Sequence, residues 1–111
     1  MPSMGHAVFR GKSGQTYRFK VYPLGTKLRP LSGVYLVTNR SRDKQGGYKH
    51  VALYVGATED LSQPPFAEHP KASDFKRFGA NSICLQSDNS EESRTAKQCD
   101  IVAALHPACN E

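Results

Sequence analysis

The alternation of apolar and polar residues near the start of the chain predicts a β-hairpin. Within residues 15–22, aromatic and aliphatic side chains alternate with Arg18 and Lys20, and a period of two is typical of a strand with one buried face. Residues 7–10 provide a shorter strand-like stretch before it. The glycines of residues 11–14 permit the positive φ angles that a tight turn needs. We therefore expect two antiparallel strands here.

Two nearly continuous apolar runs predict the next strands, at residues 33–38 and 51–56. Such runs are typical of strands covered on both faces, so we expect both strands at the centre of the sheet. Residues 39–50 are polar and basic and contain two adjacent glycines, which predicts the loop of a long hairpin. Residues 23–32 contain two prolines and predict a loop between the two hairpins.

The second half of the chain predicts short helices and one further strand. Residues 58–61 favour the start of a helix, which the prolines of residues 64–65 must end or deform. A second short helix is expected at residues 72–78, where Gly79 stops it. Residues 81–86 have the composition of a strand.

The last predicted element is the clearest helix. It begins after Asp88 or Asn89, either of which can cap it, and it ends before Pro107. Gln98 precedes its apolar positions by three, four and seven residues, so Gln98 faces the core or a cleft. Those apolar positions are Ile101, Val102 and Leu105. The elements together predict an α/β fold of the α+β type, in which helices flank a small, mostly antiparallel β-sheet.

Size and composition narrow the class of protein. A chain of 111 residues forms one compact domain, and 38% hydrophobic residues are ordinary for a globular protein. No apolar run approaches the roughly 20 residues that span a bilayer, and the start lacks the apolar segment of a signal peptide. The three cysteines are sparse and odd in number, which favours a reducing compartment. We expect a cytoplasmic protein without a membrane partner.

The charge is divided unevenly along the chain. Residues 1–50 contain ten Lys or Arg and one acid, a balance of +9, whereas residues 51–111 contain five and nine, a balance of −4. This asymmetry points to a polyanion such as DNA or RNA, and Tyr48 among the cations suits base stacking. No base-reading motif is visible, so such binding would be weakly selective and sensitive to salt. The candidate phosphate ligands are Arg18, Lys20, Arg40, Arg42, Lys44, Lys49 and Lys71.

Two short motifs resemble those of a known superfamily. The triplets Gly33-Val34-Tyr35 and Tyr54-Val55-Gly56 resemble the paired strand motifs of the GIY-YIG nucleases, although the interval between the tyrosines is longer than usual. The ending of residues 106–110 resembles the Pro-x-x-Asn that closes the domain's final helix. Residues 69–71 and 79–81 are similar to features of small bacterial single-domain members. The resemblance implies a core at residues 32–111, with residues 1–31 as an added N-terminal β-hairpin extension packed on it.

The resemblance implies hydrolysis of a nucleic-acid phosphodiester with one divalent metal, Mg²⁺ or Mn²⁺. Tyr35 and Tyr54 match the two tyrosines that face the scissile phosphate, one of them assigned to activating water. In the family, an arginine offsets the negative charge that develops in the transition state, and a glutamate on the last helix holds the metal. Asn110 matches a supporting residue at the end of the final helix.

Two of these positions depart from the family's pattern. The arginine position is Pro64, which has no donor, and the glutamate position is Gln98, a poor ligand for a hard dication. His69, Lys71 or Arg77 are candidates to supply a cation, and His69 is also a candidate catalytic residue. Asp100 is a poor substitute for Gln98, because residues two apart point in different directions on a helix. No metal ligand is assigned.

Three hypotheses follow for the function. The first is a GIY-YIG endonuclease-like protein that binds nucleic acid and cleaves phosphodiesters weakly or not at all. The second is an active, metal-dependent, structure-specific endonuclease with an altered site. The third is a non-catalytic protein-interaction module, a dead nuclease fold whose basic N-terminal face meets an acidic surface of a protein partner. As a separate alternative, Tyr35 and Tyr54 are simple strand aromatics that pack in the core. A Glu→Gln change also suits an engineered substrate trap, but Pro64 has no such explanation and favours natural degeneration.

Overall fold

The computed structural model describes residues 4–63 and 68–110, which form a five-stranded antiparallel sheet with two α-helices. This architecture confirms the predicted α+β class. The strands are β1 (His6–Arg10), β2 (Thr16–Pro23), β3 (Gly33–Arg42), β4 (Tyr48–Thr58) and β5 (Ser82–Ser87). The helices are α1 (Ala72–Arg77) and α2 (Glu91–Leu105), and a 3-10 turn follows at Ala108–Asn110.

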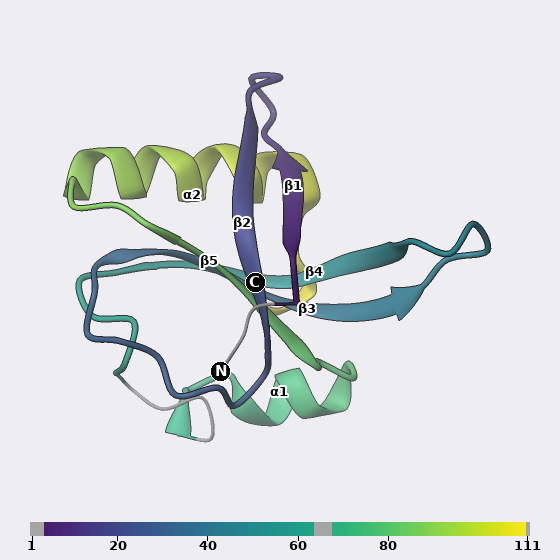
Figure 1. Cartoon of the computed structure of the whole chain (residues 1–111). Helices are drawn as coiled ribbons and strands as arrows, with labels where there is room; N and C mark the ends of the chain where they lie inside the picture. Colours follow the sequence, from purple (N-terminus) through teal and green to yellow (C-terminus); the bar gives the residue numbers. More distant parts are fainter. Residues whose placement is uncertain (1–3, 64–67, 111) are drawn as a thin grey trace.

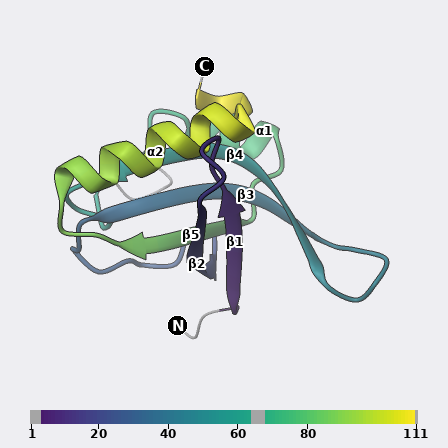
Figure 2. The same cartoon turned by 90° about the horizontal axis from the view of Figure 1, so that it is seen from above.

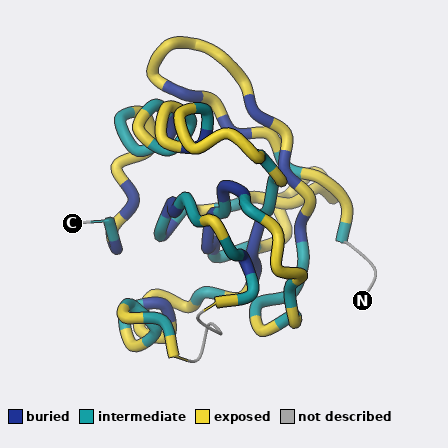
Figure 3. The backbone as a smooth tube through the Cα atoms, turned by 90° about the vertical axis from the view of Figure 1, so that its left-hand side faces the viewer, coloured by how far each residue is buried: buried dark blue, intermediate teal, exposed yellow. Residues whose placement is uncertain are grey.

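The sheet lies between the two helices, which cover opposite faces (Figures 1 and 3). On the α2 face, Ile101 is fully buried and packs with Phe19, Leu36 and other side chains of the first core cluster. On the α1 face, Phe75 belongs to a second cluster with Val37. The β1–β2 hairpin runs steeply across the direction of β3 and β4, so the curled sheet partly surrounds α2 (Figures 1 and 2).

The strand order is β1-β2-β5-β3-β4, which makes β4 an edge strand. The prediction that residues 51–56 lie at the centre of the sheet is therefore wrong, whereas the expectation for β3 is confirmed. The apolar run in β4 reflects burial of its faces: Val55 packs in the cluster below α2, and Leu53 packs in the cluster with Phe75 and Cys109. Burial of both faces thus marks a covered strand and does not require a second neighbouring strand.

The predicted loop at residues 39–50 is also wrong, because β3 continues to Arg42 and β4 begins at Tyr48. The two strands form a long arm, residues 40–50, whose tip projects beyond the rest of the sheet (Figures 1 and 2). Residues 41–49 are exposed. An arm exposed on both faces lacks the apolar alternation that reveals a half-buried strand, so the polar composition led to a loop prediction.

The turn of the β1–β2 hairpin is fastened to α2 through Asp100. The Asp100 carboxylate accepts hydrogen bonds from the Ser13 backbone N–H (2.9 Å), the Ser13 hydroxyl (2.7 Å) and the Tyr17 hydroxyl (2.7 Å). These bonds lower the pKa of Asp100, those from Ser13 most strongly. Gly11 lies against the same carboxylate, where any Cβ would overlap it. The Asp100 carboxylate thus has a structural role, in which it holds the hairpin turn against α2.

The helices follow the sequence prediction in part. Helix α1 ends before Gly79, whose φ of 76° is the left-handed conformation expected of a stop signal. The cap of α2 is Ser90, whose hydroxyl accepts the N–H of Ser93, and not Asp88 or Asn89 as predicted. Leu105, predicted to be part of the apolar stripe, is the last residue of α2 and is 38% exposed.

The helix expected to start at residues 58–61 is absent from the described part of the chain. Strand β4 continues to Thr58, and the Asp60 carboxylate then accepts from the N–H of Ser62 at 2.8 Å. This local side-chain bond stabilises a turn in place of a helix. Pro64 and Pro65 lie outside the described residues. Among those that are described, neither helix combines the length and apolar character needed to cross a membrane.

Candidate functional site

Tyr35, Tyr54 and His69 form one cluster on the α1 face of the sheet. Tyr35 and Val37 point to the same face of β3, and Val37 pairs with Tyr54 on β4, so the register places the two phenols side by side. Their ring centroids are 6.0 Å apart. The Tyr35 hydroxyl and His69 Nε2 are 3.1 Å apart, and the His69 ring is 5.1 Å from that of Tyr54. The sequence thus identified three residues that the structure brings together.

A glycine on β4 makes room for this cluster. Gly56 is paired with Tyr35, whose ring lies over it, and a Cβ at Gly56 would overlap the ring carbons and hydroxyl of Tyr35. The glycine therefore permits the phenol of Tyr35 to lie flat across the neighbouring strand, with its hydroxyl near His69. This gives a packing reason for the Gly of the Tyr54-Val55-Gly56 triplet.

The orientation of His69 is fixed from two sides. Its ring is 5.0 Å from that of Phe75 on α1, and its Nδ1 accepts the backbone N–H of Lys71 at 3.0 Å. Because Nδ1 accepts, the proton of the neutral imidazole is placed on Nε2, where it is donated to the Tyr35 hydroxyl. In this tautomer Nε2 cannot take a proton from Tyr35, so His69 is poorly placed as a general base for it.

Burial disfavours the ionised form of both Tyr35 and His69. Desolvation raises the pKa of Tyr35 far above its ordinary value of 10.0, and the neighbouring Tyr54 raises it further. Desolvation lowers the pKa of His69 below 6.5, and the positive charge of Lys71 adds to this shift. A phenolate at Tyr35 is therefore strongly disfavoured. The cluster positions hydroxyls and an imidazole without producing a strong base.

Gln98 and Asn110 meet at the backbone of Val55, on the open edge of β4. The Val55 carbonyl accepts from Gln98 Nε2 (3.2 Å) and from Asn110 Nδ2 (2.9 Å), and the Val55 N–H donates to Asn110 Oδ1 (2.7 Å). The Asn110 amide thus pairs with the edge as a neighbouring strand would. Gln98 faces the sheet, as its spacing predicted, and its amide N–H is used in holding the helix to β4.

The donor set does not fit the divalent metal that the resemblance implies. Within residues 4–63 and 68–110, no three His, Cys, Asp or Glu side chains are grouped so as to hold a metal ion. Gln98 offers only an amide oxygen, and Asp100 is held by Ser13 and Tyr17. Hard dications prefer carboxylate oxygens. We therefore assign no metal-dependent step to this site.

The predicted phosphate ligands fall on separate surfaces. Arg40, Arg42, Lys44 and Lys49 lie on the β3–β4 arm, and Arg18 and Lys20 lie on the exposed face of β2. Lys71 lies beside His69, to which its backbone N–H donates. The Arg77 guanidinium lies 5.5 Å from the Phe78 ring. The position expected for the family's arginine, Pro64, lies outside the described residues.

Sequence reasoning missed two sets of cations. Lys27 and Arg29, in the irregular loop after β2, line a groove together with Arg18 and Lys20. Loops carry no periodicity from which such a juxtaposition can be read. Arg94 is 5% exposed and donates to the Asp88 carbonyl at 3.0 Å. The one available signal for Arg94 was its position four residues before Gln98, on the same face of α2.

Compared with known proteins, the chain matches no family model, no curated protein and no solved structure. The resemblance to GIY-YIG nucleases therefore stays a prediction from the motifs quoted above.

The contact between Gly56 and Tyr35 predicts the effect of adding one methyl group. We expect Gly56→Ala to lower the free energy of unfolding by about 1–3 kcal/mol, because the new Cβ overpacks against the ring. Urea unfolding of the variant measures this change. In a Tyr35→Ala background the penalty should shrink, since the overlapping ring is gone. An unchanged penalty in that background would show that the ring is not its cause.

The environment of His69 predicts a pH dependence. We expect its imidazole to titrate below 6.5 in a proton NMR titration, because burial and Lys71 lower its pKa. The unfolded chain then binds the proton first, so stability is lost as the pH falls from about 7 through the folded-state pKa. His69→Gln should reduce this loss, measured as the urea midpoint at each pH. A His69 midpoint at or above 6.5 would contradict the desolvated environment.

Proposed function

We propose that this protein binds nucleic acid through its phosphate backbone and is GIY-YIG endonuclease-like, with weak phosphodiester cleavage or none. The observation that carries the proposal is the β3–β4 arm, which projects from the body of the protein (Figure 2) and exposes Arg42, Lys44 and Lys49. The nuclease-like part of the proposal comes from the sequence motifs.

The arm carries four cations against one acid, together with the aromatic ring of Tyr48. The Arg40 guanidinium lies 3.5 Å from the centroid of the Tyr48 ring, and that of Arg42 lies 5.9 Å away. The acid of the arm, Asp43, accepts the N–H groups of Gln45 and Gly47, each at 2.9 Å. Its carboxylate therefore stabilises the turn. Exposed cations beside a stacked aromatic ring suit contact with phosphates and unstacked bases.

The Tyr35–Tyr54–His69 cluster supports weak cleavage at most. Hydrolysis of a phosphodiester needs activation of a nucleophile and stabilisation of the charge that develops. Here the pKa of Tyr35 is raised by burial, and His69 Nε2 serves as a donor. The amide of Gln98 replaces a carboxylate and is bonded to Val55. The cluster thus has neither an activated base nor a carboxylate at position 98, which favours binding over catalysis.

The charge of the arm predicts a salt-dependent decrease in affinity when it is removed. We expect Arg42→Gln, Lys44→Gln and Lys49→Gln together to weaken duplex DNA binding by about tenfold or more at low salt. The slope of log affinity against log salt should fall by about 0.9 for each phosphate that the variant no longer neutralises. Fluorescence anisotropy with a labelled duplex measures both quantities.

A matched control removes the same charge elsewhere. Arg10→Gln, Lys12→Gln and Lys76→Gln change three exposed cations outside the arm and should leave the slope nearly unchanged. If both triple variants lose the same affinity, the decrease comes from net charge alone, and the proposed role of the arm is wrong. If the parent protein binds neither DNA nor RNA at low salt, the proposed function is wrong, and the interaction-module hypothesis gains support.

The state of the cluster predicts little or no nicking. We expect the parent protein to nick supercoiled DNA no faster than the protein-free control with Mg²⁺ or Mn²⁺, because Gln98 provides no carboxylate. The combined change Gln98→Glu with Pro64→Arg should introduce Mg²⁺-dependent nicking if the site has degenerated from an active one. Robust nicking by the parent that Tyr54→Phe abolishes would instead establish an active endonuclease.

A further inference from the structure

A groove separate from the arm lies along the outer face of β2, and we call it the β2 groove. Its volume is about 670 Å³, and it is bounded by β2, the loop of residues 26–31 and β5. Four leucines contribute an apolar lining, and Tyr22 adds an aromatic ring. Its exposed cations are Arg18, Lys20, Lys27 and Arg29. The groove belongs largely to the N-terminal extension and uses none of the residues of the tyrosine cluster.

The charge in the β2 groove is not compensated. Of the described residues that line it, none carries a carboxylate. Asp88, the neighbour of Ser87 at its edge, is paired with Lys97 at 2.9 Å, so it does not cancel the charge of the groove. Arg18 and Lys20 point to the same face of β2, about 7 Å apart along the strand. Cations at such intervals can contact successive phosphates of an extended chain.

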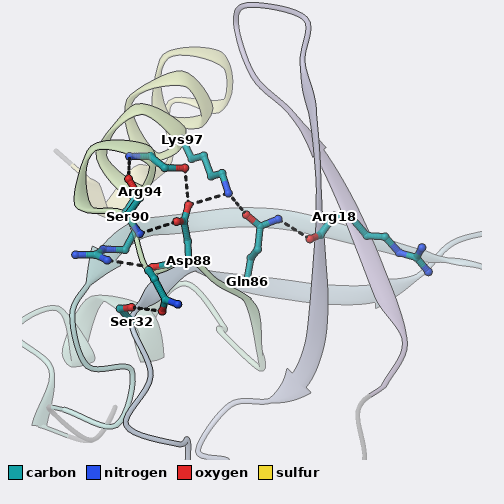
Figure 4. A network of polar contacts seen from close by, with 9 residues as sticks. Arg18, Ser32, Gln86, Asp88, Ser90, Arg94 and Lys97 are labelled. Atoms are coloured by element: carbon teal, nitrogen blue, oxygen red, sulfur yellow. Dashed lines mark hydrogen bonds and ion pairs between the residues drawn. The ribbon is translucent and has the colours of Figure 1, made fainter.

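The wall of the groove is held in place by side chains. Backbone pairing between β2 and β5 ends at Lys20 and Leu85, and Gln86 continues it by donating from Nε2 to the Arg18 carbonyl at 2.9 Å. Gln86 Oε1 accepts in turn from Lys97 Nζ at 2.6 Å (Figure 4). The ligand-facing strand is thus positioned before anything binds, which lowers the entropy that binding must overcome.

The opposite wall is also anchored at both ends. Next to Gly25, the Thr26 hydroxyl donates to the Pro23 carbonyl at 2.7 Å and closes a turn directly after β2. At the other end, the Leu61 N–H donates to the Leu31 carbonyl at 2.8 Å. The loop that carries Lys27 and Arg29 is therefore fastened to β2 and to the segment after β4. These two hydrogen bonds hold the loop in the position that forms the second wall of the groove.

We propose that the β2 groove binds a short single-stranded segment of DNA or RNA. Its cations contact the phosphates, and unpaired bases lie against Tyr22 and the leucines. This inference rests on the proposed function and adds a second, structurally distinct contact surface. A single strand fits better than a duplex, because duplex bases are stacked inside the helix and cannot reach an aromatic ring in a concave site.

The test compares two double variants that remove the same charge. Lys20→Gln with Lys27→Gln alters the groove, and Arg42→Gln with Lys44→Gln alters the arm. Anisotropy is measured with a labelled oligothymidylate of about 12 nucleotides and with a labelled duplex. We expect the groove variant to bind the single strand about tenfold more weakly, with a salt slope lower by about 1.4 for two phosphates, and to bind the duplex nearly as the parent does. Thermal unfolding verifies that both variants are folded.

The aromatic contribution is tested separately. Tyr22→Leu keeps an apolar side chain and should weaken single-strand binding several-fold without lowering the salt slope, since stacking involves no counterion release. If instead Tyr22→Leu and the groove variant both leave single-strand affinity unchanged, the inference is overturned. Competition by thymidine monophosphate at concentrations similar to those of the oligomer would also overturn it, in favour of a site for small phosphorylated ligands.

The two proposals fail in different ways. If neither the oligomer nor the duplex binds the parent protein, the proposed function fails and the groove inference fails with it. If the duplex binds through the arm and the groove variant binds the oligomer as the parent does, only the groove inference fails. A groove-specific decrease for the single strand, with the arm variant weakened on both probes, supports both.

Discussion

The backbone N–H and C=O groups on the open edge of β4 need hydrogen-bond partners, and residues of the C-terminal half of the chain provide them at Val55. An edge strand presents unpaired N–H and C=O groups, which invite pairing with other chains. Here Asn110 returns to Val55 and bonds both its N–H and its C=O, and Gln98 adds a further donor to the same carbonyl. This closure places α2 against β4 and draws the chain end back to the sheet beside Tyr54. Gln98 and Asn110, which the motifs mark as candidate site residues, thus also bond the open edge of β4.

The chemistry of the cluster follows from the same packing. Tyr35 lies over Gly56, and His69 lies against Phe75. Burial that holds the rings in place also keeps the phenol and the imidazole uncharged, because desolvation disfavours the ionised form of each. The packing that orders these rings therefore also disfavours their ionised forms, so position and protonation state have one cause.

Much of the fold could be predicted from local patterns, because half-buried strands and helix stops leave signals within a few residues. The alternation in β2 and the stop at Gly79 are examples. The position of β4 at the edge could not be predicted, because its apolar run indicates that both faces are buried and does not indicate how many strands pair with it. The arm was missed because both its faces are exposed. At the site, the tyrosine motifs indicated the cluster. The groove depends on cations from β2 and from the irregular loop that follows it, and a loop has no periodicity from which the direction of its side chains can be predicted.

Helix α2 is fastened to three different strands or turns by residues that lie close together in sequence. Lys97 bonds Gln86 on β5, Gln98 bonds Val55 on β4, and Asp100 bonds Ser13 in the β1–β2 turn. Successive helical residues point about 100° apart, so these contacts hold the helix from several directions around its axis. Rotating α2 about its axis would break all of them at once. Helix α2 is therefore held in one orientation against one face of the curled sheet, and it joins the β1–β2 hairpin to both β4 and β5.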